Sequence, residues 1–129
     1  MMAEPLTQRG GGAAVREPEG GDVYDDGNLR VEHDNYYASL GGRALKMTRK
    51  EFLLLSRLAR NPDRIVPSEE LWRHAWGLRS PLNAESLHVH VYRLRRKLEP
   101  AGTRIETMIN VGYRLLTGAA AAGTRPVRG

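Results

Sequence analysis

The sequence predicts an α+β fold in which short antiparallel strands precede three helices and a β-hairpin follows them. Three observations carry this prediction. Apolar and polar residues alternate in short runs between residues 23 and 47, as in half-buried strands. Between residues 48 and 98 the apolar spacing changes to the period of α-helices. Two further alternating runs then flank Asn110, which indicates a hairpin.

The N-terminal strands are separated by turn-forming residues. These occupy positions 25–28 and 33–35, and Gly41-Gly42 suits the tight turn of a hairpin. Strands are therefore expected at 29–32, 36–40 and 43–47, with a further apolar start at Val23. Together they predict an antiparallel sheet of three or four strands.

The first helix begins at a capping box. Thr48 is followed three residues later by Glu51, so each side chain can bond a backbone N–H at the helix start. Asn61-Pro62 is expected to end this helix. The predicted buried face consists of Phe52, Leu55, Leu58 and Ala59, and Leu54 is expected to lie beside it.

A second helix is expected to begin at Ser68 as its capping residue. Glu69 and Glu70 place anions in the first turn, where the helix dipole favours them. Gly77 is expected to end the helix. An apolar pair at 65–66 precedes it and predicts a short strand, and Leu71, Trp72 and Ala75 are expected to face the core.

The third helix, residues 85–98, separates an apolar stripe from a cationic face. The stripe follows the helical period and consists of Leu87, Val91, Leu94 and Leu98. Tyr92, Arg93 and Arg96 fall on the other side. A helix with one apolar seam and a basic face is suited to lie against an anion, and the major groove of DNA admits one α-helix.

Composition and charge agree with this target. The 129 residues carry a net charge of +5, but three arginines against eight carboxylates give residues 1–42 a charge of −5. Residues 43–129 carry 17 Lys and Arg against seven carboxylates, a charge of +10, which indicates a polyanion as partner. The predicted organisation is one domain at 22–116, with disordered segments at 1–21 and 117–129 that are rich in small and polar residues.

Several classes of protein are not indicated. The absence of cysteine excludes disulfides and thiolate metal sites, and no cofactor motif is present. No apolar run reaches the roughly 20 residues that span a bilayer. The first residues also lack the apolar core of an export signal, so a cytoplasmic location is expected, with no membrane partner.

Two helices, a loop, a basic helix and a hairpin make a winged helix-turn-helix. The expected function is sequence-specific binding of double-stranded DNA and regulation of transcription. The third helix would enter the major groove, and the hairpin wing would lie on the backbone or in the adjacent minor groove.

Four segments of the sequence resemble one family. They are LKMTRKEFLLLSRLARNPDRIV, the helix end at Trp76-Gly77, LHVHVYRLRRKLE and IETMINVGYRLL. In this order and spacing they resemble the DNA-binding effector domain of OmpR/PhoB-type response regulators, over about residues 26–116. The resemblance implies a four-stranded N-terminal sheet, three helices and a C-terminal hairpin. It also implies a regulator that binds direct-repeat half-sites as a tandem dimer.

The resemblance also implies roles for individual residues. It suggests base reading by Arg93 and phosphate contacts by Trp76, His90 and Arg95. Thr107 and Tyr113 match positions that contact the DNA backbone, and the loop at 78–82 matches one that touches RNA polymerase. With the residues expected from the helix face and the hairpin, the candidate DNA-binding set is Trp76, Ser86, His90, Tyr92, Arg93, Arg95, Arg96, Thr107, Asn110 and Tyr113.

The sequence departs from the family pattern at several positions. Ile109-Asn110 stands where the family has Arg-Gly in the wing, so only Asn110 offers a hydrogen bond to the minor groove there. His88 stands where the family usually has an Asp. Glu85 stands where the family often has an Arg, and its negative charge would repel a nearby phosphate. The 42 residues before Arg43 are too few for the family's receiver domain, so the chain is expected to be either a stand-alone DNA-binding domain or a fragment. Phosphorelay control of this chain is not indicated.

Three alternatives compete with DNA binding. A metal site at His74, His88 and His90 is disfavoured, because His88 and His90 are residues i and i+2 of a helix and point about 200° apart. Catalysis is disfavoured, because adjacent carboxylates such as Glu69 and Glu70 do not converge on one substrate. The strongest alternative is a winged-helix protein-interaction module whose basic helix meets an acidic partner.

Overall fold

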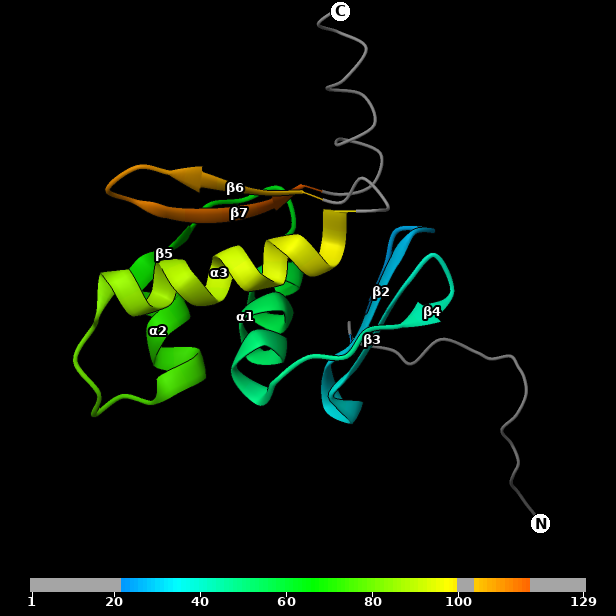
Figure 1. Ribbon diagram of the computed structural model, residues 1–129, viewed down its shortest axis with the longest axis horizontal. Helices are drawn as coiled ribbons and strands as arrows, with labels where there is room; N and C mark the ends of the chain where they lie inside the picture. Colours follow the sequence, from blue (N-terminus) through cyan, green and yellow to red (C-terminus); the bar gives the residue numbers. More distant parts are fainter. Residues whose placement is uncertain (1–21, 100–103, 117–129) are drawn as a thin grey trace, which may run out of the picture.

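The computed structural model describes residues 22–99 and 104–116 and has the predicted α+β architecture (Figure 1). An N-terminal antiparallel sheet is followed by three helices and a C-terminal hairpin, as a winged helix-turn-helix requires. The predicted disordered segments, 1–21 and 117–129, lie outside the described residues. The elements are β1 (Val23–Asp25), β2 (Leu29–Glu32), β3 (Tyr37–Leu40), β4 (Arg43–Ala44), α1 (Arg49–Arg60), β5 (Val66–Pro67), α2 (Ser68–Trp76), α3 (Ala84–Leu98), β6 (Arg104–Met108) and β7 (Gly112–Leu116).

The first sheet has the order β1-β2-β3-β4 with antiparallel neighbours. Gly41 and Gly42 have φ angles of 59° and 85°, so the predicted hairpin turn uses two left-handed residues. Two boundaries differ from the prediction. Residues 33–35 form a single 3-10 turn that leaves Tyr36 at φ 50°, so β3 begins one residue late. β4 ends at Ala44 rather than at residue 47.

The capping box of α1 is confirmed. The Glu51 N–H donates to Thr48 Oγ1 at 3.2 Å, and the Thr48 N–H donates to Glu51 Oε1 at 3.0 Å. The helix ends before Asn61, whose N–H donates to Leu58 O at 3.1 Å. The whole predicted face is buried, which places α1 in the middle of the core.

The predicted cap of α2 is wrong. Ser68 is the first helical residue, Pro67 occupies the N-cap position, and no side chain caps this helix. The Ser68 N–H donates instead to Val111 O in the hairpin turn, at 3.0 Å. The start of α2 is therefore fixed by the second sheet, whereas its end at Gly77, with φ 101°, is as predicted.

A second sheet has the order β5-β7-β6. The short predicted strand lies at residues 66–67 rather than 65–66, and it pairs with β7. The hairpin strands are each one residue shorter than predicted next to Asn110, because 109–111 form the turn. Gly112 is required here, since a Cβ on it would lie 2.0 Å from Val66 O.

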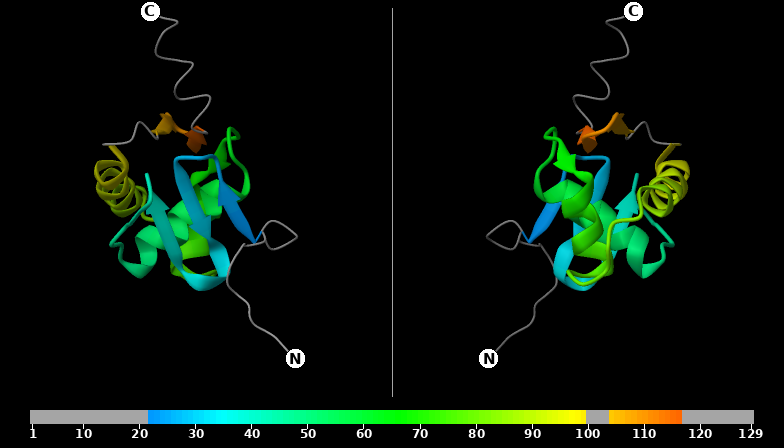
Figure 2. Two further views of the ribbon diagram at one scale, coloured as in Figure 1. Left: turned by 90° about the vertical axis from the view of Figure 1, so that its right-hand side faces the viewer. Right: turned by 90° about the vertical axis from the view of Figure 1, so that its left-hand side faces the viewer.

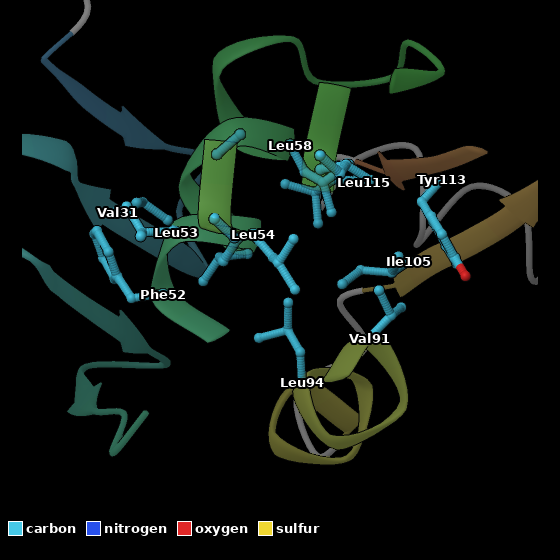
Figure 3. Close-up of a cluster of buried hydrophobic side chains, with 14 of the residues drawn as sticks. Val31, Phe52, Leu53, Leu54, Leu58, Val91, Leu94, Ile105, Tyr113 and Leu115 are labelled. Carbon is cyan, nitrogen blue, oxygen red and sulfur yellow. The ribbon is translucent and has the colours of Figure 1, made fainter. Parts of the chain in front are cut away.

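The apolar seam of α3 is buried as predicted. All four of its residues have no exposed surface. Figure 3 shows Leu94 and Val91 pointing from α3 toward Leu54 of α1 and Ile105 of β6. In Figure 2, α3 lies at one edge of the molecule, so its opposite side faces away from the other elements.

Candidate nucleic-acid interface

Helix α3 carries six of the ten predicted DNA-contacting residues, and the others lie on α2 and the β6–β7 hairpin. Asn83 caps the helix, since its Oδ1 accepts the Ser86 N–H at 3.0 Å. Arg93 and Arg96 are exposed, and Tyr92 and Val89 keep 50% and 38% of their surface. Burial of the seam therefore fixes which side of α3 is offered to a partner.

Three of the four cations near the end of α3 bond to neighbouring groups, and two of these three are Arg96 and Lys97. Arg96 donates to the Tyr92 hydroxyl at 3.1 Å and lies 3.8 Å from Glu99. The hydrogen bond to Tyr92 and the charge of Glu99 raise the pKa of Arg96. Lys97 donates to Glu51 Oε1 at 2.6 Å and to Lys46 O at 2.7 Å, which ties the end of α3 to the start of α1.

The Glu51–Lys97 contact is one that the sequence interpretation missed. Burial alone would raise the pKa of Glu51, but hydrogen bonds from Lys97 and the Thr48 backbone outweigh it and hold the pKa below its usual value. Glu51 therefore both caps α1 and anchors α3. The capping-box spacing revealed only the first role.

Arg95 joins α3 to the β6–β7 hairpin, the predicted wing. Its Nε donates to Ile105 O at 2.8 Å, and its Nη2 donates to Thr107 Oγ1 at 2.7 Å. Both acceptors belong to β6, so one guanidinium bridges α3 and the hairpin. Thr107 remains exposed beside it.

Arg93 differs from the other three cations of α3. It is exposed, and its guanidinium has no ion pair or hydrogen bond within residues 22–99 and 104–116. A bidentate contact to a base edge needs such an unengaged guanidinium.

An aromatic cluster lies at the other end of the surface. The rings of Trp72 and Trp76 are stacked with centroids 3.9 Å apart, and His90 meets the Trp76 ring edge-on at 4.9 Å. His90 Nδ1 donates to Ser86 O at 2.8 Å, because a carbonyl oxygen only accepts. Among the described residues, the Trp76 indole N–H has no hydrogen-bond partner.

Lys50 extends this cluster and was absent from the predicted set. Its Nζ lies 5.4 Å from the centre of the Trp76 ring, so it adds a cation beside the indole. Lys50 belongs to the first turn of α1, 26 positions before Trp76 in the sequence. No local motif signals a contact across that separation.

The predicted wing residues are placed differently from one another. Asn110 is exposed in the hairpin turn with φ 66°, beside Ile109, which is 79% exposed. Tyr113 is only 6% exposed, and burial raises its pKa. Its ring therefore packs in the core, and any DNA contact is limited to the hydroxyl group (Figure 3).

The loop between α2 and α3 is also fixed by an aromatic residue. Trp72 is 4% exposed, in agreement with its predicted core position, and its indole N–H donates to Ser80 O at 3.0 Å. Leu78, in the same loop, is 81% exposed. The loop thus presents two exposed apolar side chains, Leu78 and the 39% exposed Leu82, from an anchored backbone.

The described residues contain no group of three or more His, Asp or Glu side chains that could hold a metal ion. His74 lines a surface pocket together with two arginines, Arg57 and Arg73, and one carboxylate, Glu70. Burial and the nearby Arg57 and Arg60 lower the pKa of His74. No helix in the described part of the chain is long and apolar enough to cross a bilayer.

Comparisons with known proteins agree with this geometry. The family model described as "Transcriptional regulatory protein, C terminal" matches residues 42–115, more than half of the chain. The response regulator ArlR of Staphylococcus haemolyticus is 32% identical over 103 residues, which cover 78% of this chain and 47% of that protein. The chain thus spans about half the length of the curated relatives it matches.

Two solved structures show the same fold. The response regulator DrrB of Thermotoga maritima, described as an OmpR/PhoB homologue, has 29% identity and a TM-score of 0.63 over 73% of this chain and 44% of its own. The RstA DNA-binding domain of Klebsiella pneumoniae, solved in complex with the RstA box, has 26% identity and a TM-score of 0.63. It covers 74% of this chain and 97% of its own. The resemblance inferred from the sequence motifs is confirmed. The chain belongs to the transcriptional regulatory protein C-terminal family, and its fold is the winged-helix DNA-binding fold of OmpR/PhoB-type response regulators, not that of an enzyme.

Proposed function

We propose that this chain binds double-stranded DNA at specific sequences and regulates transcription, with α3 in the major groove and the β6–β7 wing on the backbone or in the adjacent minor groove. The single observation that carries this proposal is the state of Arg93. It is exposed on the outward side of α3 and has no partner among the described residues. An arginine in the major groove most often reads guanine O6 and N7.

Arg96 and Tyr92 are assigned to the same groove as a pair. Their hydrogen bond and the 5.9 Å distance from the guanidinium carbon to the Tyr92 ring centre restrict both side chains. Restricted side chains lose less entropy when they bind. The pair therefore supports Arg93 with a second cation of defined position.

The aromatic cluster is assigned to phosphate contacts. The unpartnered Trp76 N–H is a neutral donor. His90 contacts the Trp76 ring, and its Nδ1 donates to the carbonyl of Ser86 in the first turn of α3. Lys50 adds charge at the same place. Such contacts set the register of a helix on DNA without reading bases.

Thr107, Arg95, Asn110 and Tyr113 are assigned to the wing side of the interface. Arg95 retains N–H groups beyond the two that it donates to β6, so it can bridge the wing and a phosphate. Thr107 Oγ1 accepts from Arg95 and can still donate its hydroxyl hydrogen. We assign Tyr113 a hydroxyl contact only.

Other partners follow from the same assignment. The exposed Leu78 supports a contact of the 78–82 loop with RNA polymerase. Direct-repeat half-sites would bring two copies of the chain side by side as a tandem dimer on DNA. Action on chromosomal DNA would place the protein in the cytoplasm, and no metal or cofactor is part of the proposed mechanism.

The test is selection of random duplex DNA on the purified chain at about physiological salt. The expected result is a short motif that contains guanine and is repeated about one helical turn apart. Binding should weaken steeply as salt rises, since phosphate contacts release counterions. Binding without a motif would refute sequence-specific recognition and would favour the protein-interaction module.

A further inference from the structure

The tip of the wing has a chemistry different from that of α3. Ile109 and Val111 flank Asn110 in the β6–β7 turn and are 79% and 51% exposed. From Met108 to Gly112 the sequence contains no Lys or Arg. Two large apolar side chains on a three-residue turn expose surface that the core does not use. The tip is therefore the part of the wing that gains most from leaving water.

The backbone of the tip is held in place before any partner binds. The Val111 N–H donates to Met108 O at 2.9 Å and closes the turn. Val111 O accepts from the Ser68 N–H, which fixes the turn to the start of α2. Gly112 lies against the Val66 carbonyl so closely that no Cβ fits between them. A preorganised tip loses little conformational freedom on binding.

The tip also has a fixed position relative to the recognition helix. Arg95 of α3 donates to both Ile105 and Thr107 of β6. Figure 1 shows the hairpin alongside α3, with its turn at the end of the molecule where α3 begins. A duplex that docks on the outward side of α3 therefore meets the wing in a set register.

We infer that Ile109 and Val111 make an apolar contact with the minor groove beside the major-groove site of α3, and that this contact disfavours base pairs with an exocyclic amino group there. The inference rests on the proposed DNA binding. In the minor groove, a G·C pair differs from an A·T pair by the guanine N2 amino group. An apolar side chain against that amino group displaces its water and offers no acceptor. Apolar side chains are used against minor-groove base steps in other DNA-binding proteins.

An apolar contact also has a distinct salt signature. Each phosphate neutralised by a cation changes the slope of log affinity against log salt by about 0.9. Ile109 neutralises no phosphate. Its removal should therefore lower affinity at every salt concentration and leave the slope unchanged.

The experiment uses the full chain and a duplex that contains the selected motif. Each G·C pair beside the motif is replaced in turn by inosine·C, which removes the minor-groove amino group and keeps the major-groove hydrogen-bonding groups. The wild-type chain should bind one or two of these duplexes about fivefold more tightly, near the low end of the effect of an unsatisfied polar group. Ile109→Ala should abolish this preference and weaken binding at constant salt slope.

Ile65→Ala is the matched control, because it makes the same side-chain change at a residue that is 38% exposed and lies between α1 and β5 instead of in the β6–β7 turn. It should retain the inosine preference. Thermal melting by circular dichroism establishes that each variant is folded. The inference is overturned if Ile109→Ala binds every duplex as the wild type does, or if the inosine preference survives this change. It also falls if no motif is selected, and in that case the proposed function fails with it. If a motif is selected but Ile109→Ala binds as the wild type does, the wing contact is refuted and the proposed function stands.

Discussion

The β1–β4 sheet and helix α3 differ in how far their charged side chains are paired within the fold. Residues 22–47 carry three cations against five carboxylates, whereas residues 84–98 carry four cations against one. In the sheet, Arg30 lies 3.0 Å from Asp25 and 2.9 Å from Glu32, so it forms ion pairs with residues of β1 and of its own strand, β2. In α3, Arg93 is left without a partner among the described residues. A charge satisfied within the fold acts on stability, and one left to solvent is available to a ligand.

The same comparison sorts the cations within α3. Arg95, Arg96 and Lys97 follow Arg93 closely, and composition treats all four alike. In the structure, Arg95 donates to Thr107 of the wing, Arg96 donates to Tyr92, and Lys97 donates to Glu51 of α1. Four residues of equal charge therefore differ in structure: three are bonded within the fold, and Arg93 is available to a ligand.

The largest expected effect separates stability from recognition. Leu29 in β2 and Leu94 in α3 are both fully buried, so either change to Ala should lower the free energy of unfolding by about 2–5 kcal/mol. Only Leu94→Ala is expected to alter the DNA preference of the folded molecules, because it loosens the helix that bears Arg93. Urea denaturation and motif selection on both variants measure these effects. A changed motif for Leu29→Ala would show that the sheet takes part in recognition.

Arg93→Ala should have the next largest effect, on recognition alone. Loss of a bidentate contact removes about 1–3 kcal/mol of discrimination at one base pair. The free energy of unfolding should stay within about 0.5 kcal/mol of the wild type, since the side chain has no partner in the fold. Competition binding with single base-pair variants gives the discrimination.

Arg43→Ala removes an equal charge from the exposed end of the sheet and should leave the discrimination unchanged. A duplex with 7-deazaguanine at the read position lacks N7 and should weaken the wild-type chain but not Arg93→Ala. Equal loss on all sequences for Arg93→Ala would assign this arginine to phosphate rather than to a base.

The sequence predicted the side of α3 but not the engagement of its cations. Burial of Leu87, Val91, Leu94 and Leu98 follows from spacing along one helix, which periodicity reads directly. The bonds from Arg95 to Thr107 and from Lys97 to Glu51 span 12 and 46 positions and depend on tertiary packing. The cap of α2 failed for the same reason, since Val111 lies 43 residues from Ser68.

Thr107→Val tests the brace between helix and wing, with a smaller expected effect. The change keeps the side-chain volume and removes one of the two acceptors of Arg95, while Ile105 O remains. Loss of one such hydrogen bond costs about 0.5–1.5 kcal/mol. In the free protein, the amide resonances of β6 should shift, and affinity should fall on all duplexes by a similar factor.

Arg95→Lys is the matched variant, because it keeps the charge and loses the planar fork that reaches two acceptors. It should shift the same β6 resonances without DNA. If both variants leave the free wing unchanged, and Arg95→Lys binds DNA as the wild type does, Arg95 acts as a charge and not as a brace.

The last expected effect is a pH trend that belongs to the sheet side of the comparison. His33 is 5% exposed, and its Nδ1 lies 2.6 Å from Ser56 Oγ of α1. Burial and the charge of Arg60 lower the pKa of His33, although Asp34 and Asp22 oppose this. The unfolded chain therefore binds a proton more readily than the folded one, and the free energy of unfolding should decrease as pH falls below about 6.5. Burial lowers the pKa of His74 as well, so it contributes in the same direction.

The measurement is urea denaturation between about pH 7.5 and pH 5, above the range in which Glu32 and Glu51 protonate. His33→Asn keeps a hydrogen-bonding atom near the Nδ1 position and should flatten part of the trend. His33→Asn combined with His74→Asn should flatten more of it. DNA preference should not change with either variant, since neither histidine lies on α3 or the wing. A free energy of unfolding that rises on acidification would contradict the lowered pKa values of His33 and His74. A changed DNA motif in either variant would show that residues outside α3 and the wing take part in recognition.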